Sequence, residues 1–153
     1  MTSTAGAKNR IIEVSKNGLF QLTQKLFLRD KDHLLVLRDK KSGTGDLPGG
    51  RMTEGEFFGD WRISLMREIE EELGTSLTLE IDPEPVFTKK HRVEEGNFPC
   101  IILAYRANFL TGEIRLSDEH DYFEWVDLKT YNPKILFSAY MLDAVEFYIQ
   151  HFK

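Results

Sequence analysis

The sequence contains one cysteine, no long apolar segment and only a modest excess of negative charge. A lone Cys100 excludes both an internal disulfide bond and a zinc site built from cysteines. No apolar run approaches the roughly 18 residues that a membrane-spanning helix needs. The 25 acidic and 20 basic residues give a net charge of −5, which argues against broad electrostatic binding of nucleic acid. We therefore expect a soluble globular protein with no membrane contact.

The length of 153 residues, with 41% hydrophobic residues, is typical of one domain with a substantial core. We expect residues 1–8 to form a flexible tail and residues 9–153 to form a single domain. The first ten residues lack the apolar segment of a signal peptide, so we expect a cytoplasmic protein. Cys100 lies in an apolar run and is expected to be a small buried residue rather than a nucleophile.

Apolar periodicity predicts alternating strands and helices. A helix is expected at residues 138–152, with apolar residues at helical spacing. Its apolar stripe comprises Met141, Leu142, Val145, Ile149 and Phe152. The expected strands cover residues 19–28, 33–37, 77–81, 86–89, 100–106, 112–116 and 122–126. Elements in this order indicate an α/β fold with a mixed sheet flanked by helices.

Residues 67–74 concentrate carboxylates on one helical face. Positions i, i+3 and i+4 of a helix share a face, so Glu68, Glu71 and Glu72 project together. The apolar residues of the same helix cluster roughly 120° away. Three like charges repel one another, and a hard divalent cation such as Mg²⁺ would remove that penalty because it prefers oxygen ligands. The alternative is an ordinary solvated acidic face.

The residues at both ends of this helix are typical of helix termini. Asp60 is a favoured N-cap and Gly74 a favoured residue just past the C-terminus, so the helix is expected to span residues 61–73. Before it, Phe57, Phe58 and Trp61 could stack on a nucleobase, but we expect them to pack in the core.

A glycine turn precedes the helix. Gly49 and Gly50, in the segment Leu-Pro-Gly-Gly-Arg, permit backbone conformations closed to other residues and allow close approach to a ligand. The segment Glu-Gly-Glu, ending at Glu56, follows.

This order of motifs resembles the Nudix box, which reads glycine, five residues, glutamate, seven residues, then Arg-Glu-apolar-x-Glu-Glu-x-Gly-apolar. Here Gly50 is followed by five residues and Glu56, and then by ten residues and Arg67-Glu-Ile-Glu-Glu-Glu-Leu-Gly74. The second gap is three residues longer than the family pattern, and Thr75 replaces the final apolar residue. The longer gap leaves the helical spacing intact. It could change the role of Glu56 and the shape of the adjoining loop.

The resemblance implies a Nudix hydrolase domain over residues 9–153, with an α/β/α sandwich and the glutamate helix against the sheet. It implies hydrolysis of a phosphoanhydride bond in a nucleoside diphosphate linked to another moiety, with Mg²⁺ or Mn²⁺ as cofactor. The metal ligands would be Glu68, Glu71, Glu72 and the Gly49 carbonyl. Arg67 would orient a glutamate, with Glu56 the family-based partner and Glu71 within reach at i+4.

A second segment, Ser-Asp-Glu119-His120, precedes a Trp-Val strand, as in many Nudix enzymes. The resemblance makes Glu119 a candidate to bind a metal or to activate water, and an exposed acidic loop is the alternative. The proton acceptor would be Glu119 or a helix glutamate such as Glu68. His120 could instead be the base, because histidine titrates near neutral pH.

The substrate contacts are less defined. Glu56 and Arg51 are candidate substrate-binding residues, although a solvated surface charge is the simpler reading of Arg51. Lys89, Lys90 and Arg92 could likewise meet phosphates or remain solvated.

Two other functions share the fold. A non-catalytic nucleotide-binding module would explain the longer gap but gains little from three clustered carboxylates. Isoprenoid diphosphate isomerases use cysteine chemistry, for which Cys100 has no evident partner. The expected partner is a nucleotide-type small molecule. A short RNA 5′ end is a less favoured substrate. The sequence does not decide whether the protein forms a homodimer.

Overall fold

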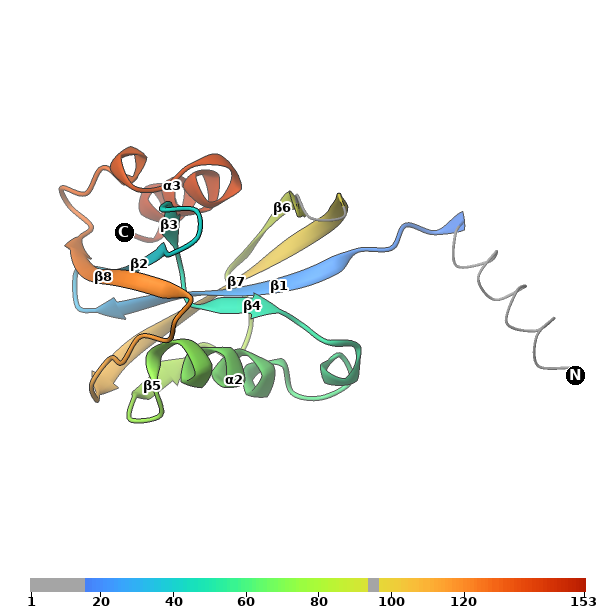
Figure 1. Ribbon diagram of the computed structural model, residues 1–153, viewed down its shortest axis with the longest axis horizontal. Helices are drawn as coiled ribbons and strands as arrows, with labels where there is room; N and C mark the ends of the chain where they lie inside the picture. Colours follow the sequence, from blue (N-terminus) through green and yellow to red (C-terminus); the bar gives the residue numbers. More distant parts are fainter. Residues whose placement is uncertain (1–15, 94–96) are drawn as a thin grey trace, which may run out of the picture.

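The computed structural model describes residues 16–93 and 97–153, so the expected tail at residues 1–8 lies outside the described residues. Figure 1 shows a sheet with one helix on each side, α2 (Trp61–Leu73) and α3 (Ala139–Phe152). The strands are β1 (Gln21–Asp30), β2 (His33–Asp39), β3 (Gly45–Asp46), β4 (Gly49–Arg51), β5 (Thr78–Ile81), β6 (Phe87–Val93), β7 (Phe98–Thr111) and β8 (His120–Asp127). Two short 3-10 helices, η1 (Glu54–Glu56) and η2 (Pro133–Ile135), complete the described elements.

The sheet is mixed and is centred on β1. This strand pairs in parallel with β7, so that Gln21 lies opposite Cys100 and Arg29 opposite Asn108. It pairs antiparallel with β2 and with the short β4. Beyond these, β2 pairs with β3 and β8, and β7 pairs with β5 and β6. The α/β/α sandwich with a mixed sheet is therefore confirmed.

Two cores lie on the two faces of the sheet, because successive residues of a strand point to opposite sides. On β2, Leu34 belongs to the core beneath α3 and Leu35 to the core beneath α2. In the predicted stripe of α3, Met141 and Val145 are buried, and the other members pack against the same core. Neither helix of the described chain is long and apolar enough to cross a membrane.

One predicted strand is wrong. Residues 112–116 form no strand, and β7 ends at Thr111. The backbone of this segment pairs with the end of α2 instead, since Arg115 N–H donates to Leu73 O (2.8 Å) and Ser117 N–H donates to Glu72 O (3.1 Å). The segment therefore satisfies helix carbonyls that would otherwise lack partners.

The expected burial of the aromatic cluster is also wrong in part. Phe58 is 92% exposed and Phe57 is 48% exposed, and the two rings meet edge to face at 5.0 Å. Only Trp61 packs against the core beneath α2, and its indole N–H donates to Phe57 O (2.8 Å). Trp61 lies one helical turn before buried Leu65, whereas the two phenylalanines precede the helix and its buried face.

Candidate functional site

The glycine turn lies between β1 and α2 in very close contact with both. Gly49 has a φ of +131°, and a Cβ atom there would lie 2.0 Å from the Gln24 carbonyl oxygen. A Cβ atom at Gly50 would lie 2.6 Å from the Glu68 carboxylate. Gly49 therefore requires glycine, whereas a side chain at Gly50 would displace the Glu68 carboxylate. The close approach lets Gly49 N–H donate to Glu72 Oε2 at 3.0 Å.

The rotation of α2 about its axis is set by its apolar side. Asp60 caps the helix by accepting from Arg62 N–H (2.9 Å), and Leu65, Ile69 and Leu73 are fully buried. The predicted helix bounds are confirmed. With that face buried, Glu72 turns toward the sheet and Glu71 stays largely exposed.

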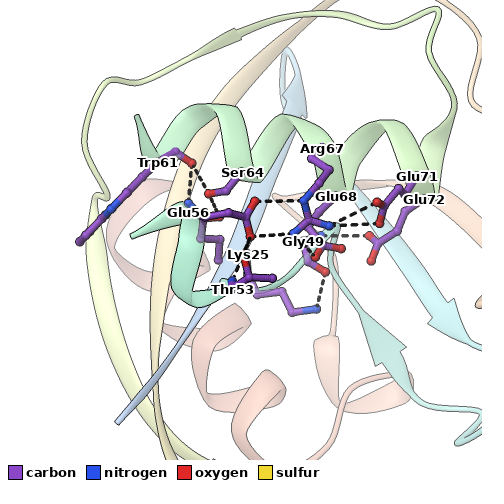
Figure 2. Close-up of polar contacts among 11 residues, drawn as sticks. Lys25, Gly49, Thr53, Glu56, Trp61, Ser64, Arg67, Glu68, Glu71 and Glu72 are labelled. Atoms are coloured by element: carbon purple, nitrogen blue, oxygen red, sulfur yellow. Dashed lines mark hydrogen bonds and ion pairs between the residues drawn. The ribbon is translucent and has the colours of Figure 1, made fainter. Parts of the chain in front are cut away.

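Arg67 holds several of the glutamates together. Its Nε donates to Glu56 Oε2 (3.0 Å) and its Nη2 to Glu56 Oε1 (2.9 Å), so Arg67 forms a bidentate pair with the partner that the family resemblance implies. It also contacts Glu68 (3.1 Å) and Glu71 (3.3 Å), as Figure 2 shows. The hydrogen bonds from Arg67, and then that from Thr53 N–H, lower the pKa of Glu56 to about 2.

A buried lysine, missed by the sequence analysis, supports the glycine turn. Lys25 on β1 is 7% exposed, and its Nζ donates to Asp46 Oδ1 (2.8 Å), Leu47 O (3.1 Å) and Gly49 O (3.5 Å). The contact with Gly49 is visible in Figure 2. The sequence does contain a signal for Lys25, which is a lysine within an apolar strand. An isolated buried ammonium is costly, so such a lysine indicates nearby polar partners.

Glu72 is the buried carboxylate of the site, at 4% exposure. Burial raises its pKa to about 7, although nearby Lys25 and the Gly49 N–H act in the opposite direction. Burial also raises the pKa of Glu68 against the effect of Arg67, with the charges of Glu71 and Glu119 adding to the rise.

The loop before β8 folds back onto α2 and brings Glu119 to Glu72. A carboxylate oxygen from each of these residues and a ring nitrogen of His120 all lie within 4.8 Å of one another. Asp39, Asp46 and His120 form a second such group, and within residues 16–93 and 97–153 no other group of three meets this distance. Of the three helix glutamates, only Glu72 belongs to either group, while Glu68 and Glu71 contact Arg67.

The donor set at Glu72 and Glu119 fits a divalent cation. Both residues supply carboxylate oxygens, which are the ligands that hard cations prefer. The raised pKa values of Glu68 and Glu72 show that the ionised carboxylates are disfavoured where they lie. A bound positive charge would remove that penalty.

Other candidates lie outside this group. Arg51 at the end of β4 donates to Gln21 Oε1 (3.2 Å) and is exposed. Lys89 pairs with Asp143 (3.4 Å), and Arg92 donates to Asn97 O (3.1 Å). Cys100 is buried beside the Thr23 hydroxyl at 2.9 Å, as expected of a small core residue.

Comparison with known proteins identifies the family of this chain. A model of the NUDIX domain matches residues 20–144. The chain belongs to the NUDIX family. A search of curated proteins finds no match to this NUDIX chain.

Solved structures share the fold of this NUDIX protein. A MutT NUDIX hydrolase from Burkholderia pseudomallei is 18% identical, with a TM-score of 0.67 over 88% of this chain and 99% of that one. The MutT protein from Methanosarcina mazei Go1 is 22% identical, with a TM-score of 0.65 over 90% and 98%. The E. coli dihydroneopterin triphosphate pyrophosphohydrolase is 16% identical, with a TM-score of 0.64 over 86% and 98%.

Proposed function

We propose that this NUDIX protein is a divalent-metal-dependent pyrophosphohydrolase. Its substrate would be a nucleoside diphosphate linked to another moiety. The observation that carries the proposal is the convergence of Glu72 and Glu119, within 4.8 Å, beside the glycine turn. A non-catalytic nucleotide-binding module is the alternative. It would gain little from a buried carboxylate whose pKa burial raises to about 7.

Glu72 and Glu119 would hold Mg²⁺ or Mn²⁺, with Glu68 and Glu71 beside them on the helix. When bound, the cation would neutralise phosphate oxygens and lower the pKa of a bound water. The Gly49 carbonyl was an expected ligand, and it lies 3.5 Å from the Lys25 ammonium. A carbonyl oxygen has two lone pairs, so Gly49 stays a candidate ligand beside this long contact.

Two carboxylates are candidates to accept the proton of the attacking water. Glu119 is exposed and lies beside Glu72. Glu68 is partly buried, and burial raises its pKa, which makes its carboxylate a stronger proton acceptor. Arg67 would act as a positioning residue, because its guanidinium contacts Glu56, Glu68 and Glu71. Attack at one phosphorus would release two phosphorylated products.

The longer gap in the Nudix box would be accommodated between η1 and α2. Glu56 closes η1 by accepting from Thr53 N–H at 2.9 Å, and Asp60 caps α2. The added residues would then lie in the exposed segment 57–60, which leaves the Glu56–Arg67 pair intact. Both oxygens of Glu56 accept from Arg67, so we assign Glu56 to positioning rather than to substrate contact. Exposed Arg51 remains the candidate for substrate phosphates.

The test combines a substrate panel with matched variants. The protein with Mg²⁺ is incubated with ADP-ribose, nucleotide sugars, dinucleoside polyphosphates, nucleoside triphosphates and 5′-triphosphorylated RNA, and the phosphate products are identified. On the substrate that is cleaved, Glu72→Gln and Glu119→Gln should each reduce kcat by about 100-fold, equivalent to about 3 kcal/mol of transition-state stabilisation. Glu71→Gln should have a smaller effect, because Glu71 is largely exposed.

Glu54→Gln is the control, since Glu54 is an exposed carboxylate on η1 outside the site. Binding of nucleotides without cleavage across the whole panel would favour the binding module. Full activity of Glu72→Gln on a confirmed substrate would contradict the metal role.

A further inference from the structure

His120 occupies an unusual position at the start of β8. Its side chain is buried, with the residue only 4% exposed. Nε2 lies 3.0 Å from Asp46 Oδ2, whereas Nδ1 is buried and has no hydrogen-bond partner among the described residues. A buried polar atom without a partner costs free energy, so an additional partner is expected for Nδ1.

The surroundings of the ring point to a cation as that partner. A ring nitrogen of His120 lies within 4.8 Å of carboxylate oxygens of both Glu72 and Glu119. Because Asp46 engages Nε2, a neutral ring with its proton on Nε2 would leave Nδ1 with a lone pair to donate. A single cation could therefore be bound by Glu72 from α2 together with Glu119 and His120 from the start of β8 and the loop before it.

Asp46 is held so that it orients the ring. Its Oδ1 accepts from Lys25 Nζ (2.8 Å) and from Leu47 N–H (2.8 Å), which leaves Oδ2 for His120. The ion pair between Lys25 Nζ and Asp46 Oδ1 (2.8 Å) favours the ionised carboxylate. An ionised Asp46 accepts the Nε2 proton. A carboxylate bonded to the second ring nitrogen is the usual arrangement around a metal-binding histidine.

We propose that His120 ligates, through Nδ1, the same divalent cation that Glu72 and Glu119 bind, with Asp46 and Lys25 orienting the ring. The inference rests on the proposed function, because the cation is the one assigned there. A nitrogen donor in the set favours Mn²⁺ or Co²⁺ over Mg²⁺, since imidazole suits transition metals and Mg²⁺ prefers oxygen. His120 would then be a ligand and not the base.

Pulsed electron paramagnetic resonance of the full chain loaded with Mn²⁺ tests this directly. Imidazole nitrogen bound to Mn²⁺ produces a ¹⁴N modulation, which should change when histidine is labelled with ¹⁵N. The signal should vanish in His120→Gln and persist in His33→Gln, where the exposed histidine lies at the start of β2. Mn²⁺ affinity, measured by titration, should fall at least about tenfold in His120→Gln.

The outcomes separate the two proposals. Mn²⁺ binding that is lost in Glu72→Gln, with no histidine nitrogen signal in the unaltered protein, would overturn the role of His120 and leave the Glu72 site standing. Mn²⁺ binding unchanged in Glu72→Gln would overturn both. Where His120→Gln does not fold, the absence of a histidine nitrogen signal in the ¹⁵N-labelled unaltered protein would still overturn the proposal. A signal that persists in His33→Gln, His91→Gln and His151→Gln would assign the nitrogen to His120.

Discussion

Glu72 is a residue whose burial works against the stability of the metal-free fold. The residue is 4% exposed, and burial raises the pKa of its carboxyl from 4.5 to about 7. The folded state therefore holds this proton more tightly than the unfolded chain does. In the absence of a cation, stability should fall as the pH rises from about 4.5 to about 7.

Glu72→Gln should remove this dependence, because glutamine does not ionise and its oxygen can still accept from Gly49 N–H. The shift corresponds to roughly 3 kcal/mol, so the variant should gain about that much unfolding free energy relative to the unaltered protein between pH 5 and pH 8. Urea unfolding of both proteins in EDTA across this range measures the difference. Parallel pH profiles for the two proteins would contradict the raised pKa.

At the level of single residues, the sequence singled out Glu68, Glu71 and Glu72 by helical spacing, which is a local property. It did not distinguish them, because their burial depends on where the sheet and the loop before β8 lie. Lys25 and Asp46 carried no local motif. Their pairing at 2.8 Å arises only when β1 and β3 come together.

Helix α2 is the element on which the site depends, and its N-cap is a local interaction. Asp60 accepts from Arg62 N–H (2.9 Å) and pairs with the Arg62 side chain (3.2 Å). Asp60→Ala should reduce the unfolding free energy by about 1 kcal/mol, because the first helical N–H groups lose an acceptor. Urea unfolding provides the measurement.

Asp60→Asn is the matched control for the cap, since asparagine keeps the side-chain oxygen and caps about as well as aspartate. It should stay close to the unaltered protein. An alanine variant as stable as the asparagine variant would show that the cap contributes nothing.

Local signals explain which elements were predicted. The bounds of α2 follow from Asp60, the apolar spacing and Gly74, all within the element itself. The failed strand at residues 112–116 satisfies helix carbonyls that lie far from it in sequence, such as Leu73 O. Apolar alternation cannot show that an extended segment pairs with the end of a helix rather than with a strand.

For the molecule as a whole, one sheet separates two cores, and β2 contributes to both. Leu34 and Leu35 are adjacent and fully buried, yet they face opposite helices. Leu34→Ala and Leu35→Ala should each destabilise the fold by about 2–5 kcal/mol. Because both cores share the same strands, each variant should unfold in a single transition.

Calorimetry tests whether the two faces unfold together. Agreement between the calorimetric and van't Hoff enthalpies in both variants would support one cooperative unit. Two separate transitions in either variant would show that the α2 and α3 faces unfold independently.

The sequence by itself determined the family resemblance, the bounds of α2 and the presence of clustered carboxylates, because caps, periodicity and motif spacing act over a few residues. Only the tertiary structure decided that Glu72, rather than the whole trio, meets Glu119 and His120 within 4.8 Å. This arrangement depends on the loop before β8, which folds back onto the end of α2. It also depends on Lys25, which binds the Asp46 carboxylate that contacts the His120 ring. Such contacts join segments distant along the chain, and their geometry is set by packing around the shared sheet.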